Sequence, residues 1–311
     1  MKASRPGGSS WTVHLALAAA QTGFALFPIF GKLALVSIPP FVIAAIRVVS
    51  SAAMLEIVRR FSPSEPVRRE DRRLLLTLAI LGVSLNQVLF IVGLSLTSAI
   101  NTTILISSIP AFTLTAAVLL GREALTRRAL VGTLLAGAGA LVLLNAERFD
   151  WGSRLFRGNL LILANSLSYS LYLVLARPLL ARYSALTFTA AVFRYGTLPI
   201  LAVSIPALAV FSPEVPARGA WWSLGAVVLF STAVPYFLNS WALARVSASR
   251  VATYVFLQPV IAATLAILVL GERPGWRTWM AAVLVFAGLA LSIGVRSPLT
   301  TSELSPSGRG G

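Results

Sequence analysis

Residues 93–123 of the chain read GLSLTSAINTTILISSIPAFTLTAAVLLGRE, and their composition indicates the fold class. From Ser98 to Leu120 it carries no charged side chain. An apolar run of about 20 residues is long enough to cross the roughly 30 Å hydrocarbon core of a bilayer as an α-helix. Lipid offers the backbone no hydrogen-bond partner, so such a run has to be helical. The stretch therefore predicts a transmembrane helix that ends just before Arg122 and Glu123.

The rest of the chain has the same apolar character. Hydrophobic residues make up 57% of the 311 residues and charged residues only 12%, and the mean hydropathy is +0.84. A soluble domain carries roughly 25% charged residues, so most of this surface is expected to face lipid. Ten apolar runs predict ten spans: Trp11–Val36, Pro39–Ile57, Leu74–Leu96, Ser98–Leu120, Leu130–Ala146, Gly158–Leu180, Ala185–Phe211, Ala220–Ala244, Ser249–Leu270 and Trp276–Val295.

The opening pattern returns in the second half of the chain. Residues 242–272 read ALARVSASRVATYVFLQPVIAATLAILVLGE. Identical residues lie 149 positions apart at Leu94/Leu243, Ser98/Ser247, Ala99/Ala248, Pro110/Pro259, Thr115/Thr264, Glu123/Glu272, Arg128/Arg277 and Gly139/Gly288, and 147 apart at Phe41/Phe188, Ala44/Ala191 and Arg47/Arg194. Each half holds five spans, an odd number, so the halves enter the membrane from opposite sides. The sequence therefore predicts an all-α membrane protein with ten transmembrane helices, arranged as two inverted five-helix repeats.

The connections and termini set the predicted domain limits. We expect a disordered tail over residues 1–10, a first repeat over 11–146, an outer linker over 147–157, a second repeat over 158–295 and a disordered tail over 296–311. Both tails are rich in Gly, Ser and Pro, a composition that does not support a packed core.

Positive charge indicates the orientation. The net charge is +16, and 17 Lys and Arg residues lie in segments on the side of the N-terminus, against 6 in the opposite segments. This bias predicts that both termini are cytoplasmic in a multi-pass protein of a bacterial inner membrane. The basic excess is thus an orientation signal, and we expect no nucleic-acid partner. The sequence is compatible with a monomer.

Composition also excludes several kinds of site. The chain has no Cys and one His, His14, so neither a thiolate nor a multi-His metal site can form. No acidic residue lies in the middle of a predicted span. We therefore expect no catalytic residues, no metal and no cofactor, and weak or no obligatory proton coupling through a membrane carboxylate.

At residues 93–123 and 242–272 the chain resembles the EamA-type family of the drug/metabolite transporter superfamily. The marks are a helix with an internal proline, an acidic residue thirteen positions later and then a Gly-rich helix, together with Arg47 after PPFVIAAI. The resemblance covers roughly residues 12–295. It implies a five-plus-five helix repeat around a central cavity, and export or exchange of amino acids or similar metabolites.

Paired prolines and polar stripes are the candidate functional residues. Pro110 and Pro259 interrupt corresponding helices, which points to a transport site between the repeats. Asn and Gln facing lipid would be costly, so they are expected to point inward, either to a substrate or to a structural hydrogen bond. The candidates for substrate binding are Gln21, Phe24, Phe27, Asn86, Gln87, Phe90, Asn165, Ser168, Tyr169, Tyr172, Tyr236, Asn239, Ser240, Tyr254 and Gln258.

Charged residues near or within the spans have two interpretations. Arg47 and Arg194 could hold an anionic ligand group, but their duplication favours a structural role. We interpret Glu123 and Glu272, beside Arg122 and Arg273, as members of loop ion pairs.

The predicted function is a transporter that exports or exchanges amino acids or similar small amphipathic metabolites by alternating access. The alternative is a lipid or sugar-phosphate translocator of the same superfamily, with Arg47 or Arg194 holding the phosphate.

Overall fold

The computed structural model describes residues 10–122, 126–144, 152–212 and 218–292. The regular secondary structure in these ranges is entirely helical. Within them, eight helical segments are long and apolar enough to cross a membrane. This confirms an all-helical, multi-pass membrane protein. Residues 1–9, 145–151 and 293–311 lie outside the described ranges. The predicted tails fall there, except for Ser10, and so does the part of the predicted linker before residue 152.

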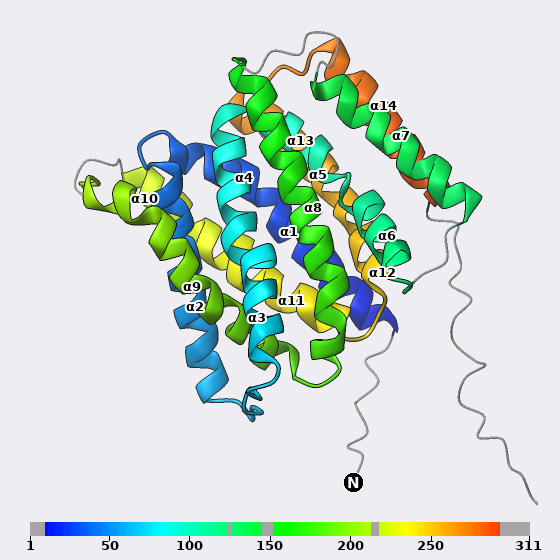
Figure 1. The fold of residues 1–311 in the computed structure, drawn as a ribbon. Helices are drawn as coiled ribbons and strands as arrows, with labels where there is room; N and C mark the ends of the chain where they lie inside the picture. Colours follow the sequence, from blue (N-terminus) through cyan, green and yellow to red (C-terminus); the bar gives the residue numbers. More distant parts are fainter. Residues whose placement is uncertain (1–9, 123–125, 145–151, 213–217, 293–311) are drawn as a thin grey trace, which may run out of the picture.

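The helices follow one another with short connections (Figure 1). The first half contains α1 (Ser10–Leu35), α2 (Pro40–Arg60), α3 (Arg72–Ala79), the π-helical η1 (Ile80–Ser84), α4 (Leu85–Leu96), α5 (Ala99–Ile106), α6 (Ile109–Leu119) and α7 (Arg127–Leu144). The second half contains α8 (Arg154–Leu180), α9 (Ala185–Ala209), α10 (Arg218–Val228), the π-helical η3 (Leu229–Ala233), α11 (Val234–Leu243), α12 (Ala248–Thr253), the 3-10 turn η4 (Tyr254–Phe256), α13 (Leu257–Leu270) and α14 (Trp276–Ser292). The α8 helix begins at Arg154, whereas the sequence predicted that this span begins at Gly158.

Serine side chains begin four of these helices. Ser98, Ser153, Ser184 and Ser247 each accept a hydrogen bond from the backbone N–H three residues later. Such a cap satisfies one of the N–H groups that a helix leaves without an internal partner. Ser98 and Ser247 are matching positions of the repeat, so their identity reflects the need to start the same helix twice.

The helical irregularities also repeat. The π-helical segment from Leu229 begins 149 residues after the one from Ile80. The segment Ala99–Leu119 breaks between α5 and α6, just before Pro110, and the segment Ala248–Leu270 tightens into η4 just before Pro259. Proline has no N–H to donate to the preceding turn, so a helix loses a hydrogen bond and bends there. Both halves therefore carry corresponding flexures.

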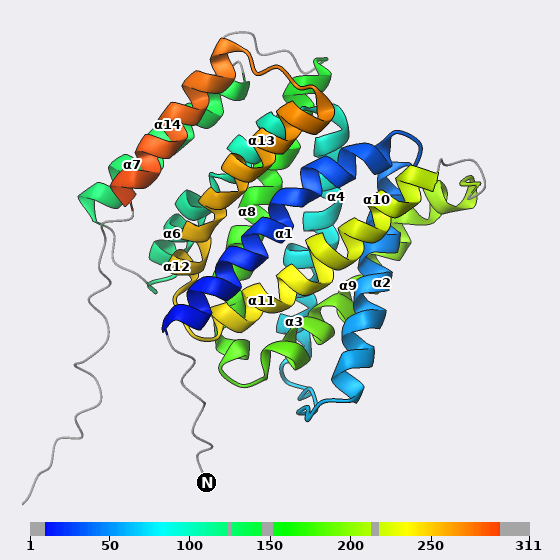
Figure 2. The same ribbon diagram turned by 180° about the vertical axis from the view of Figure 1, so that it is seen from behind.

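Each half places its first helix inside the other half. The α1 helix packs against α10, α11 and α13, and α8 packs against α4, α5 and α6. Helices α7 and α14 lie side by side along one flank of the molecule (Figures 1 and 2). The central bundle is consequently built from both halves, and the space at its middle lies between them.

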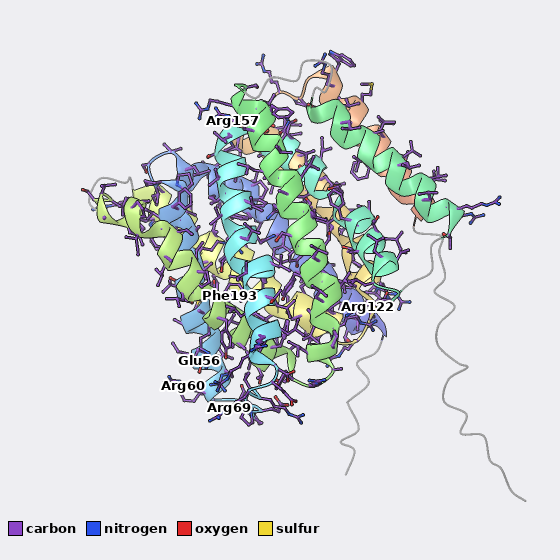
Figure 3. The ribbon with its side chains drawn as sticks, viewed as in Figure 1. Glu56, Arg60, Arg69, Arg122, Arg157 and Phe193 are labelled. Carbon is purple, nitrogen blue, oxygen red and sulfur yellow. The ribbon has the colours of Figure 1, made fainter. Side chains whose placement is uncertain are left out.

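Charged side chains gather at the two ends of the bundle. Glu56, Arg60 and Arg69 lie at one end and Arg157 at the other, with Phe193 between them (Figure 3). At the first of these ends Asp71, at the start of α3, accepts hydrogen bonds from Arg182 at 2.7 Å and from the Tyr183 hydroxyl at 2.6 Å. These contacts tie α3 to the α8–α9 connection.

Candidate functional site

A small cavity lies at the centre of the bundle, between the two halves. Its walls come from α1, α2, α4, the α5–α6 break, α8, α11 and α13. The lining residues are Phe24, Phe27, Arg47, Asn86, Gln87, Phe90, Ile106, Ile109, Asn165, Tyr169, Tyr236 and Gln258. Nine of the fifteen residues predicted to bind substrate are among them. The cavity volume is about 50 Å³, below the roughly 300–1,000 Å³ of a small-molecule site, so a metabolite requires the walls to separate.

Arg47 is the charged group of this cavity. Its side chain is only 2% exposed, and it reaches from α2 across to η3. Nη2 donates to the Ser231 carbonyl at 3.0 Å, Nε donates to the Thr232 hydroxyl and Nη1 to the Gln87 side-chain oxygen. Ser231 lies in the π-helical segment η3, and Pro235, four residues on, has no N–H to donate to its carbonyl. Arg47 donates to this carbonyl from α2.

Aromatic rings form much of the remaining wall. Phe27 stacks on Phe90 with ring centroids 4.2 Å apart, and the Arg47 guanidinium carbon lies 3.5 Å from the Phe27 ring centre. Phe24 and Phe193 each meet the Tyr236 ring edge-on, at 5.4 and 5.0 Å. Stacked and edge-on pairs of this kind hold rings in fixed orientations. The cavity therefore has the Arg47 guanidinium at one end, beside an apolar wall of aromatic rings held in fixed orientations.

Amide and hydroxyl groups complete the polar part. The Gln87 amide nitrogen donates to the Tyr236 hydroxyl at 3.1 Å, and that hydroxyl lies within hydrogen-bond reach of the Gly82 carbonyl and the Asn86 side-chain oxygen. Gly82 belongs to η1, so both π-helical segments contribute a carbonyl to the site. The Asn165 amide donates to the Asn86 carbonyl at 2.8 Å and joins α8 to α4.

A second polar chain crosses the bundle beside the cavity. The Gln258 amide donates to the Gln21 side-chain oxygen at 2.6 Å, and the Gln21 amide donates to the Asn239 oxygen at 3.4 Å. Asn239 in turn donates to the Tyr169 hydroxyl at 3.0 Å. These four residues, here called the amide chain, connect α13, α1, α11 and α8. Gln258 and Tyr169 line the cavity, whereas Gln21 and Asn239 do not.

Four other candidates lie away from the lining. Ser168 donates to the Leu81 carbonyl at 2.7 Å, and Tyr172 is buried behind Tyr169 with their rings stacked at 5.6 Å. Ser240 is buried on α11, and Tyr254 contacts His14. Ser168 and Tyr172 follow Asn165 at helical spacing and share its face of α8, but only Asn165 and Tyr169 on that face line the cavity.

The two candidate prolines and Arg194 are also outside the cavity lining. Pro259 borders a separate, mostly apolar crevice of about 250 Å³ between α5, α13 and α14. Arg194 is exposed on α9, 5.5 Å from the Tyr195 ring centre. Arg47 and Arg194 match in sequence but differ in surroundings, so the duplication does not show that Arg47 is merely structural. Ile106 and Ile109 were missed, although they flank the break before Pro110.

Glu272 has a different role from the predicted loop ion pair. Its carboxylate accepts the backbone N–H groups of Ala99 at 2.7 Å and Ile100 at 2.9 Å, at the start of α5. A carboxylate at a helix N-terminus is favoured by the N–H groups there and by the helix dipole. Its counterpart Glu123 lies outside the described residues.

Comparison with known proteins gives a consistent result. The model of the EamA-like transporter family matches residues 11–145 and again residues 156–294. A protein of Archaeoglobus fulgidus described as an uncharacterized transporter is 28% identical over 286 residues, which cover 90% of this chain and 96% of the relative. The uncharacterized transporter YetK of Bacillus subtilis is 25% identical, with 90% and 86% covered. A solved crystal structure superposes with a TM-score of 0.65 at 20% identity, over 91% of this chain and 98% of the other.

Proposed function

The chain belongs to the EamA-like transporter family, and from this premise we propose that it exports or exchanges amino acids or similar small amphipathic metabolites by alternating access. The observation that carries the proposal is the central cavity, which both halves line with amide, hydroxyl and aromatic side chains. A site of this kind suits a solute with an apolar body and a polar end.

The proposed topology has ten spans in two inverted repeats, with α7 and α14 as the fifth and tenth. It is supported by the 149-residue offset between the π-helical segments and by the exchange of α1 and α8 between halves. The positive-inside bias supports cytoplasmic termini in a bacterial inner membrane.

Alternating access would open the cavity to one side at a time. In this conformation the amide chain crosses the bundle on one side of the cavity. At the opposite end, Glu272 caps α5, and the Thr97 hydroxyl donates to the Asn159 side-chain oxygen at 2.6 Å. Separation of the halves at either set of contacts would admit a substrate, and the corresponding breaks before Pro110 and Pro259 are natural hinges. A sugar-phosphate translocator is the second candidate, because Arg47 places a cation in the cavity.

Counterflow in reconstituted vesicles tests the proposal. Vesicles preloaded with one unlabelled amino acid or related metabolite at a time are diluted into the same labelled compound, and transient accumulation identifies a substrate. We expect Gln258→Leu to reduce accumulation at least tenfold. Thr264→Val, on the exposed side of the same helix, is the matched control and is expected to retain it.

No accumulation of any compound by the folded wild-type protein, across amino acids, organic acids and sugar phosphates, would overturn the proposal. Equal losses in Gln258→Leu and Thr264→Val would show that the central cavity is not the site.

A further inference from the structure

We propose that the transported species is a monoanion whose carboxylate binds Arg47, and that the inside-negative membrane potential drives its net export. This inference rests on the proposed function and names a substrate class and a driving force for the same site.

The first step is the charge of the cavity. Arg47 is the charged member of the lining, and its guanidinium stays protonated in proteins. The carboxylates of the described residues are all held elsewhere: Glu56 by Arg59, Glu65 by Thr187, Glu70 by Arg68, Asp71 by Arg182 and Glu272 by the start of α5. Within the described ranges, the empty site therefore carries one positive charge with no negative counterpart.

The second step is how that charge is held. The Gln87 amide oxygen, the Thr232 hydroxyl and the Ser231 carbonyl each accept one hydrogen bond from Arg47. All three are neutral, and neutral acceptors compensate a buried charge less well than an anion does. A guanidinium has five N–H groups, and these three bonds use the one on Nε and one on each of Nη1 and Nη2. The second N–H of Nη1 and of Nη2 is therefore left for a two-point contact with a carboxylate. The Phe27 ring beneath the guanidinium leaves its edge as the side of approach.

The third step selects the charge of the ligand. A phosphate monoester carries about −1.5 to −2 charges at neutral pH and would leave excess negative charge in the cavity. A zwitterion would leave the net positive charge of the site unchanged and would add an ammonium to a lining in which the described residues provide no carboxylate. A monocarboxylate neutralises Arg47, and once the walls separate its apolar body would lie against Phe24, Phe90 and Tyr236.

The fourth step follows from charge conservation. The loaded site is neutral and the empty site is positive, so an inside-negative potential draws the empty carrier back toward the cytoplasm. Each export cycle moves one negative charge outward. One charge moved through 100 mV is worth about 2.3 kcal/mol, which corresponds to an about fiftyfold concentration ratio. No membrane carboxylate has to carry a proton.

The test uses three probes that share a phenyl group and differ in charge: phenylpyruvate as monoanion, phenylalanine as zwitterion and phenyl phosphate as dianion. Efflux of each labelled probe from proteoliposomes is measured at zero potential and at an interior-negative potassium diffusion potential, against protein-free vesicles. We expect phenylpyruvate efflux to exceed that of the other two at least tenfold. The interior-negative potential should accelerate phenylpyruvate efflux. At 100 mV it should shift the steady-state ratio of outside to inside phenylpyruvate toward about fiftyfold.

Variants at Arg47 and at its sequence match Arg194 distinguish the effect of the cavity charge on transport from an effect on folding. Arg47→Gln is expected to lower phenylpyruvate efflux at least tenfold, and Arg47→Lys to restore part of it. Arg194→Gln, at the sequence-matched but exposed position, should behave as wild type. If Arg47→Gln does not fold, Arg47→Lys decides: it keeps the charge but loses the two-point contact, so its affinity for phenylpyruvate should fall, and an affinity unchanged from wild type would contradict the role of Arg47.

Two results would overturn the inference while leaving the proposed function intact. One is faster efflux of phenylalanine or phenyl phosphate than of phenylpyruvate, and the other is phenylpyruvate efflux that does not respond to potential. Absence of counterflow for every compound would instead overturn the proposed function itself.

Discussion

The carboxylate of Glu272 accepts a hydrogen bond from the backbone N–H of Ala99 at 2.7 Å. Residues 173 positions apart in sequence are thereby joined, and a loop of the second half becomes the cap of a helix in the first. Lys32 donates to the Thr97 carbonyl immediately before that helix, and the Thr97 hydroxyl donates to Asn159 at 2.6 Å. The Glu272–Ala99 and Thr97–Asn159 hydrogen bonds thus each join the two halves at this end of the bundle.

Replacing Glu272 by Ala removes both hydrogen bonds to the start of α5 and the negative charge at its N-terminus. We expect the free energy of unfolding to fall by about 1–2 kcal/mol, the usual range for a lost cap. Thermal unfolding in detergent measures the effect. Glu70→Ala, an exposed carboxylate in a surface ion pair, is the control, and equal losses in the two variants would contradict the capping role.

Gly158 and Gly93 allow α8 and α4 to approach closely. A Cβ at Gly158 would lie 3.0 Å from the Gly93 carbonyl oxygen and 2.8 Å from the Leu96 Cβ. Gly158→Ala should therefore push the helices apart and cost about 1–3 kcal/mol. Gly225→Ala, where no such atom lies within 4 Å, should be neutral or slightly stabilising because alanine favours helices. An unfolding temperature for Gly158→Ala at or above wild type would refute this account.

Gln21 lies at the middle of the amide chain. Gln21→Leu leaves the Gln258 amide without its acceptor and the Asn239 oxygen without its donor. A buried polar group left unsatisfied costs about 1–3 kcal/mol, so both stability and counterflow should decrease. The neighbouring Thr22→Val changes an exposed residue whose hydroxyl bonds only its own helix, and it should leave both measurements unchanged. A loss in Thr22→Val as large as in Gln21→Leu would argue against the amide chain.

Tyr183 predicts a specific dependence of stability on pH. Burial and its hydrogen bond to Asp71 raise the pKa of the Tyr183 hydroxyl above its ordinary value of 10.0. The neutral hydroxyl therefore stabilises the folded state, fully below pH 10 and progressively less as pH rises through the raised pKa. Tyr183→Phe should lose about 1 kcal/mol near pH 7.

The stability difference between wild type and Tyr183→Phe should then stay constant up to about pH 9 and shrink above pH 10. Chemical unfolding of both proteins across this range measures it. A difference that grows at alkaline pH would show that the hydroxyl does not act through Asp71.

Much of the helical framework follows from local sequence. Apolar length predicted the eight long segments, Ser98 and Ser247 begin matching helices, and the helix breaks lie just before Pro110 and Pro259. Each of these depends on residues within one or two turns. The π-helical segments were not predicted, because nothing in the residues from Ile80 or from Leu229 distinguishes them from ordinary helix.

The candidate site was predictable in part for the same reason. Asn86 and Gln87 were assigned inward because lipid cannot satisfy their amide groups, and both line the cavity. Helical spacing could not tell a residue in the lining, such as Tyr169, from one packed behind it, such as Tyr172. That distinction depends on the width of the contact between neighbouring helices.

Patterns in the sequence were enough to predict a helical protein in lipid, and they indicated where the chain is duplicated and which helices bend. These properties depend on hydrophobic length and on the missing N–H of proline, which act locally. The packed structure was needed to show that Arg47 faces the Ser231 carbonyl in the cavity while Arg194 lies exposed, and that Glu272 caps a helix of the other half. The rotation of each helix about its axis selects these partners, and packing between distant segments sets that rotation.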